Sequence, residues 1–118
     1  MLMWSDRIIG PKYQGYSRFD TPHNDLSAAL DRIPRDIIQC DWHYEWHREY
    51  PSVPFLAGKG FRVWPAGFLP LKSAEAFSNY ALTQRTNVIG YLATTWTETS
   101  ITNSPNWPPI KEILPRWK

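Results

Sequence analysis

The sequence contains a single cysteine, Cys40, which excludes an internal disulfide and a metal site built from several cysteines. No apolar run approaches the ~20 residues that a membrane-spanning helix needs. Charge is nearly balanced, with 13 basic and 11 acidic residues and a formal net charge of +2. Because the basic residues are scattered, we expect no nucleic-acid partner, and because no apolar run is long enough, we expect no membrane partner. The 118 residues, 42% of them hydrophobic, allow at most one globular domain and exclude a disordered chain.

Tryptophan and proline are abundant, with seven and eleven residues respectively. Eleven prolines exclude a helical bundle, because proline breaks helix interiors. The N-terminus begins directly with a strand-like apolar run, residues 1–4, which indicates a fragment or a start codon inside a longer reading frame. The lack of a targeting sequence therefore says nothing about the compartment.

Hydrophobic patterning predicts strands and helices in alternation. The clearest helix is 71–85, where Ala74, Phe77 and Ala81 fall on one face, and Asn87 turns the chain after it. This rhythm, repeated at intervals of ~25–35 residues, is typical of βαβ units and a parallel sheet. The predicted strands are 1–4, 36–42, 61–64 (ended by Pro65) and 88–96, the shorter helices are 26–33, 53–57 and 110–114, and irregular segments cover 5–23, 43–51 and the Pro-rich tail 103–118.

Aromatic and acidic residues follow the predicted strands. A glycine-rich phosphate loop and a Walker lysine are both absent, so a nucleotide-binding fold has no support. In a parallel (β/α)8 barrel, the C-terminal strand ends and their loops build the active site. A full barrel takes ~250 residues, so four strands in this length predict an α/β fold that is half of a barrel. The residues at these strand ends include Trp4, Asp6, Asp41, Tyr44, Trp64, Trp96 and Glu98.

The strand ends resemble a known family. Residues 3–6 (MWSD) and 90–98 (GYLATTWTE) are similar to the fifth- and eighth-strand endings of family 20 glycoside hydrolases, the β-N-acetylhexosaminidases and their bacterial relatives. Residues 41–45 (DWHYE) and 63–66 (VWPA) fall where strands six and seven of that barrel should lie. The resemblance covers nearly the whole chain, 1–118, as strands five to eight of the parent barrel.

The resemblance implies roles for the strand-end residues in binding a terminal N-acetylhexosamine. Trp4 and Trp96 would form walls around the sugar, and Glu98 would accept hydrogen bonds from its hydroxyls. Tyr44 resembles the pocket tyrosine of the family. General chemistry agrees, because a pyranose C–H face packs on an aromatic plane while hydroxyls need a few polar groups. Strand residues two apart share a side, so Trp96 and Glu98 should point the same way, as should Trp4 and Asp6.

The chain departs from the family at the catalytic centre. Family members carry an adjacent Asp-Glu pair at the end of strand four, and this sequence contains no Asp-Glu dipeptide. A glycosidase needs two correctly spaced acids, or one acid plus substrate assistance. We therefore assign no catalytic residue and expect the chain alone to hydrolyse nothing. No metal and no cofactor are assigned either.

Structural roles are the alternative for each candidate. Trp4, Trp42, Trp64 and Trp96 could pack in a core or an interface, since aromatic residues favour strands. Of the acids, Asp6 could cap a turn, Asp41 could be a buried acid bound to backbone, and Glu98 could be solvated.

Two further side-chain patterns invite a functional interpretation. His43 and His47 stand four apart, but the spacing around Glu45 is not that of a zinc-binding His-Glu-x-x-His helix. Cys40, in the middle of a predicted strand, reads as a small buried apolar residue.

Two rival functions remain at this point. The chain could be a non-catalytic carbohydrate-binding or interaction module that uses the same aromatic platform, or a gene fragment without function. Half a barrel also leaves two open sheet edges and an uncovered inner face. The expected partners are therefore an N-acetylhexosamine-type sugar and either a second copy of the chain or a missing N-terminal half-barrel.

Overall fold

The computed structural model describes residues 1–6, 8–9, 27–96 and 101–118, and its architecture is α/β. Four parallel strands form one sheet in the order β1-β2-β3-β4. The strands are β1 (Leu2–Trp4), β2 (Ile38–Trp42), β3 (Val63–Gly67) and β4 (Leu92–Ala93). The parallel sheet expected from the strand–helix rhythm is thus confirmed.

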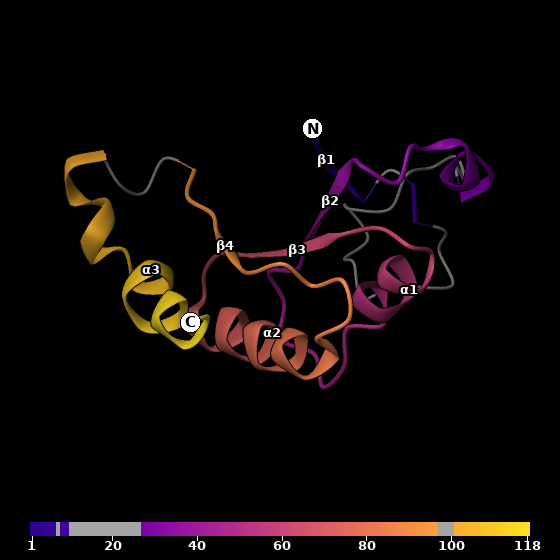
Figure 1. Cartoon of the computed structure of the whole chain (residues 1–118). Helices are drawn as coiled ribbons and strands as arrows, with labels where there is room; N and C mark the ends of the chain where they lie inside the picture. Colours follow the sequence, from indigo (N-terminus) through magenta and orange to yellow (C-terminus); the bar gives the residue numbers. More distant parts are fainter. Residues whose placement is uncertain (7, 10–26, 97–100) are drawn as a thin grey trace.

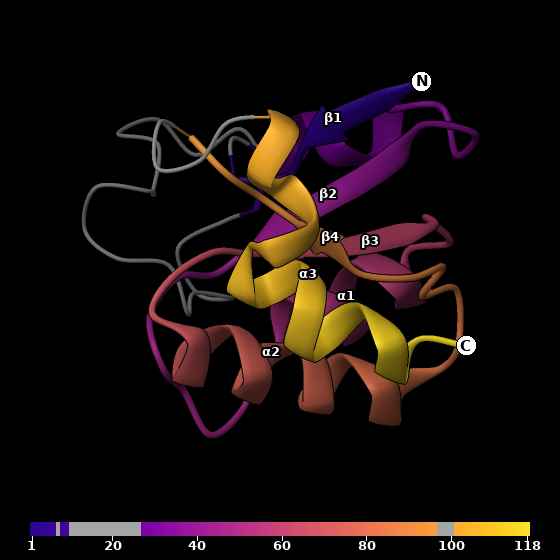
Figure 2. The same cartoon turned by 90° about the vertical axis from the view of Figure 1, so that its left-hand side faces the viewer.

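Helical segments connect the strands and close the chain. Between strands lie η2 (Ser27–Arg32), α1 (Ser52–Gly58) and α2 (Leu71–Gln84), and after β4 come η3 (Ile101–Asn106), α3 (Pro108–Ile113) and η4 (Leu114–Arg116). Figures 1 and 2 show α1 and α2 on the same side of the sheet, with α3 alongside α2. The connections therefore cover one face of the sheet.

The period of two along each strand divides the sheet residues between its faces. Met3, Gln39 and Val63 are register partners, and Met3 and Val63 pack into the core beneath α1. Their neighbours in sequence point to the opposite side, which we call the open face. By register the open face carries Leu2, Trp4, Ile38, Cys40, Trp42, Trp64, Ala66 and Leu92.

The hydrophobic core lies between the sheet and its helices in two clusters. The first surrounds Leu56, Phe61 and Val63 beside α1. The second surrounds Tyr50, Phe77 and Tyr91 beneath α2, and the C-terminal Trp117 packs on it. Burial raises the pKa of Tyr91, so its hydroxyl stays protonated and donates to the Ala74 carbonyl at 3.1 Å.

The third strand continues through Pro65, where the sequence predicted its end. Val63 donates a hydrogen bond to Asn87, and the next amide on that edge would belong to Pro65. Val63 pairs with Val88 and Ala66 pairs with Leu92, so the later strand contains one extra residue in a bulge. The bulge therefore lies beside Pro65, which has no N–H to donate to a ladder hydrogen bond.

The fourth strand is much shorter than the expected 88–96, and the same bulge explains the difference. Gly90 lies in the bulge with φ of 153°, a value that side chains rarely adopt. Regular pairing resumes only at Leu92 and Ala93. Before the bulge, Asn87 turns the chain as expected, with φ of 59° and its side-chain amide donating to Ala57.

The remaining elements follow the sequence closely. The long helix is confirmed as Leu71–Gln84, and the segment 43–51 is irregular as expected. The expected helix 26–33 is a 3-10 helix, and most of the predicted loop 5–23 lies outside the described residues. Within the described part of the chain, no helix combines the length and apolarity needed to cross a bilayer.

We expect Gly67→Ala to destabilise the fold, because the added methyl group would overlap the Tyr91 hydroxyl and its ring carbon Cζ. Overpacking of this kind costs about 1–3 kcal/mol, which urea denaturation measures. Gly58→Ala is the matched control: open space surrounds it, and it should leave stability unchanged or raise it. Tyr91→Phe should restore part of the loss in the Gly67→Ala background. Equal stability of the two alanine variants would contradict this packing.

Candidate functional site

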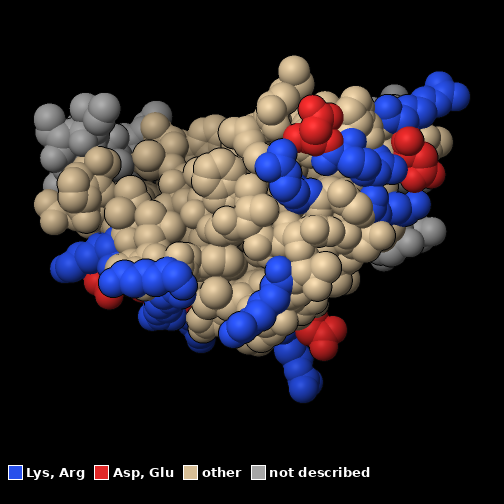
Figure 3. Space-filling view, viewed as in Figure 1, with Lys and Arg blue, Asp and Glu red and all other residues tan. Residues whose placement is uncertain are grey.

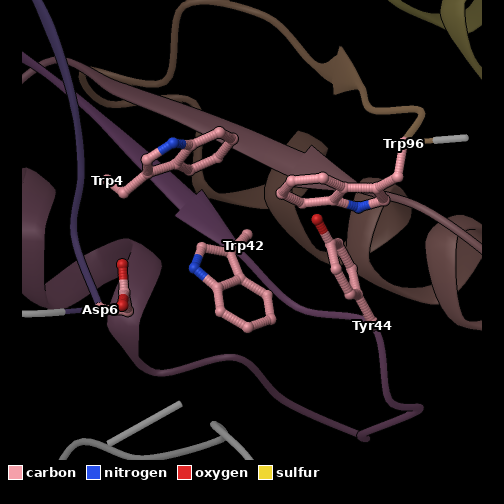
Figure 4. Close-up of a pocket in the computed structure, with 5 residues that line it drawn as sticks. All are labelled: Trp4, Asp6, Trp42, Tyr44 and Trp96. Atoms are coloured by element: carbon pink, nitrogen blue, oxygen red, sulfur yellow. The ribbon is translucent and has the colours of Figure 1, made fainter. Parts of the chain in front are cut away.

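An aromatic cleft lies on the open face at the C-terminal ends of the strands. Its volume is about 310 Å3, at the small end of the range for ligand pockets. Figure 4 shows the side chains that line it: Trp4, Asp6, Trp42, Tyr44 and Trp96.

Strand alternation explains how these residues come together. Trp4 ends β1, and Asp6 follows two residues later on the same side. Trp42 ends β2, and Tyr44 follows it in the same way. Trp96 lies beyond β4, four residues after Leu92. Because the strands are parallel, all three of these C-terminal strand ends lie at the same end of the sheet.

The cleft combines exposed and half-buried rings. Trp4 is 43% exposed and Trp96 is 62% exposed, so both offer accessible aromatic surface. Trp42 and Tyr44 lie deeper, in contact with each other at 4.7 Å between ring centroids. In Figure 4 the hydroxyl end of Tyr44 points toward the ring of Trp96. The arrangement provides flat apolar walls with one phenolic hydroxyl between them.

Asp6 supplies the charged group among the described lining residues. The residue is only 7% exposed, and its carboxylate reaches the same cleft as Trp4. A carboxylate accepts several hydrogen bonds, so this group can bind ligand hydroxyl or N–H donors next to the aromatic walls.

Contacts with Thr94 and Phe68, and through them with Trp107, hold Tyr44 in place on the side away from the cleft. Its hydroxyl lies 3.4 Å from the Thr94 hydroxyl, and Thr94 donates to the Gly67 carbonyl at 2.8 Å. Phe68 contacts Tyr44 and stacks on Trp107, with ring centroids 5.3 and 5.8 Å apart. The indole N–H of Trp107 donates to the Thr94 carbonyl at 3.1 Å. The C-terminal tail thus supports the cleft, a role that sequence patterning could not reveal for Trp107.

Asp41 lies on the other face of the sheet, away from the cleft. It is fully buried between β2 and α1, and Ser5 and Ser52 donate to its two carboxylate oxygens at 3.2 and 2.7 Å. His43 Nε2 lies 2.7 Å from the Ser52 hydroxyl. Of the two sequence interpretations, sugar ligand or buried acid, the structure places Asp41 as a buried acid, bound to hydroxyls.

The group of Asp41, His43 and Ser52 has the composition of a hydrolase triad but not its geometry. A catalytic histidine accepts the serine proton. Here the Ser52 hydroxyl donates to Asp41, so His43 Nε2 must be the donor to Ser52. The three residues are at most 2% exposed, which excludes substrate from them. Their arrangement ties β2 to α1 and provides no nucleophile.

The other candidates are distributed away from the cleft. Trp64 lies half-buried on the open face in β3, near Gly90, and does not line the cleft. Glu98 lies outside the described residues. His43 and His47 contact each other edge to face with ring centroids 6.4 Å apart. Among the described residues no three metal-ligating side chains of His, Cys, Asp or Glu form a group.

We expect Ser52→Ala to destabilise the protein by about 1–3 kcal/mol, because it removes a donor from a buried carboxylate. Chemical denaturation followed by circular dichroism measures the change. Thr83→Ala, which removes an exposed hydroxyl, should shift stability by less than about 0.5 kcal/mol. If the two variants were equally stable, the buried network would not contribute to the fold.

Two comparisons with known proteins complete the description of the site: no protein-family model matches the chain, and no curated protein matches it. Any functional conclusion therefore depends on the cleft itself and on the resemblance of the strand endings.

Proposed function

We propose that the aromatic cleft binds a sugar ring of the N-acetylhexosamine class. On this proposal the chain is the sugar-binding half of a (β/α)8 barrel similar to that of family 20 glycoside hydrolases. The observation that carries the proposal is the convergence of three tryptophans, one tyrosine and one carboxylate on a cleft of about 310 Å3.

The chemistry of the cleft suits a sugar. The C–H faces of a pyranose pack on aromatic planes, and Trp4 and Trp96 are exposed enough to offer them. Hydroxyl and acetamido N–H groups need acceptors nearby, which the Asp6 carboxylate provides. Tyr44 adds a hydroxyl that is braced by Thr94 and can donate or accept.

The position of the cleft agrees with the proposal. Ligands of parallel α/β sheets bind outside the C-terminal ends of the strands. Sequential strand order with α1 and α2 on one face is the arrangement found in a β/α barrel. Barrels of this kind form their active site at these same ends of the strands, which supports the proposal.

Binding without cleavage is the chemistry that these residues support. A glycosidase places two acids on opposite sides of one bond, within about 5–9.5 Å of each other across the substrate. Asp6 lines the cleft, whereas Asp41 is sealed on the opposite face of the sheet. The two acids cannot act on the same bond, and the sequence has no Asp-Glu pair.

We expect Trp96→Ala to weaken binding of N-acetylglucosamine by about 5- to 150-fold, the equivalent of about 1–3 kcal/mol for a lost stacking ring. Because Trp96 is largely exposed, the fold should persist. NMR titration measures the affinity, and Trp46→Ala, an exposed tryptophan outside the cleft, is the matched control.

The titration also includes tetramethylammonium, because aromatic cages with a carboxylate bind quaternary ammonium ions as well. Tighter binding of this cation than of the sugar, or equal effects of the two tryptophan variants, would contradict the proposal.

We further expect the purified chain not to hydrolyse nitrophenyl N-acetylglucosaminide between about pH 4 and about pH 8, because the acid pair is missing. Release of nitrophenol is followed by absorbance. Turnover that Asp6→Asn abolishes would place a catalytic acid in the cleft and overturn the assignment of binding alone.

A further inference from the structure

The open face of the sheet is apolar and partly exposed. By register its strand residues are aliphatic, aromatic or cysteine, and none is charged. Apart from Met1 and Trp46, the exposed large apolar side chains of the described residues lie on this face or extend from it: Leu2, Trp4, Ile89 and Trp96. In Figure 3 charged side chains gather over the helices at the bottom and at the right-hand end, and the band between them is uncharged.

The last helices of the C-terminal tail do not cover the open face. They pack on α2, on the other side of the sheet. Trp117 donates to Ser78 at 2.8 Å, and Arg116 pairs with Glu75 at 3.0 Å. Figure 2 shows α3 running along α2. All-parallel sheets are almost always covered on both faces, so this sheet lacks one of its two layers within the described residues.

Both edges of the sheet are also open among the described residues. β1 pairs with β2 alone, and β4 pairs with β3 alone. The outward N–H and C=O groups of an edge strand are a template for another strand.

The open face contains a hollow. Trp4 ends one edge strand and Trp96 follows the other edge strand, β4, by three residues, and both line the same small cleft. An occupant that covers the whole face would fill this hollow and also extend both edge strands.

We propose that the occupant is a second copy of this chain, related by a two-fold axis along the strands, so that the two sheets close into one eight-stranded barrel. In that arrangement β1 of each copy continues β4 of the other in the parallel sense, and both open edges are paired. Eight strands enclose an interior that side chains just fill, so the two open faces cover each other. A helix or an extended peptide would cover the face or one edge and leave the rest open. The uncharged face creates no repulsion between copies.

The assembly does not depend on which ligand the cleft binds. Light scattering coupled to size exclusion tests it at high micromolar concentration, where the mass should be twice the 13.8 kDa of one chain. Leu2→Lys places a charge on the open face at the edge strand and should yield a folded monomer. Leu2 is 51% exposed in the single chain and lies outside the cleft. The substitution should therefore disturb neither the fold of the single chain nor the cleft. Trp46→Lys, at an exposed site off the sheet, should remain dimeric.

Cross-linking tests the strand pairing. Leu2→Cys and Ile89→Cys lie near opposite edges, so a short bis-maleimide should link the two variants in a mixture and neither variant to itself. The buried Cys40, whose thiol pKa is raised by burial, should react slowly.

A wild-type monomer, an open-ended aggregate, or a Leu2→Lys dimer would each overturn the proposal. If Leu2→Lys does not fold, Ile89→Lys makes the same test from the other edge. A wild-type chain that is monomeric alone and binds only a different half-barrel would assign the face to that partner instead.

Discussion

The two-residue period of the parallel strands is the constraint on which the rest of the structure depends. It directs Met3, Gln39 and Val63 toward the helices and Trp4, Trp42 and Trp64 toward the open face. The same alternation continues past the ends of β1 and β2, because Asp6 and Tyr44, two residues beyond Trp4 and Trp42, also line the cleft. Alternate residues of the same strands therefore form the core and the cleft. A slip of one residue in register would move the core residues to the open face and the cleft residues to the helix side.

A buried polar network lies on the helix side of this division. Asp41 accepts hydrogen bonds from Ser5 and Ser52, so one carboxylate near the end of β2 connects the residue after β1 with the start of α1. A buried charge is costly unless hydrogen bonds satisfy it. The network satisfies Asp41 only when the three segments are correctly placed, which makes it specific for this arrangement of strands. The position of the cleft thus depends on residues that do not line it.

The C-terminal tail also holds the cleft in place. Trp107 contacts Phe68 and Thr94, and both of these contact Tyr44 at the floor of the cleft. The last helices then anchor this segment on α2 through Trp117. Tail and cleft are coupled through packing, so the shape of the site depends on residues of the tail. A ligand that orders Tyr44 would stabilise the tail in turn.

By itself the sequence determined the parallel α/β class, the long helix α2 and the turn at Asn87. It also determined that Trp4 and Asp6 lie on the same side. All of these depend on local periodicity and turn chemistry. Only the tertiary structure decided the path of β3 through Pro65, since the bulge at Gly90 comes from a strand that follows it in the chain. It also decided that Asp41 faces α1, because an acid at a strand end is suited to either face until register is known. The position of Trp107 beside the site was also decided by the tertiary structure. Its partners, Phe68 and Thr94, are distant in sequence, and local patterns do not predict contacts between distant residues.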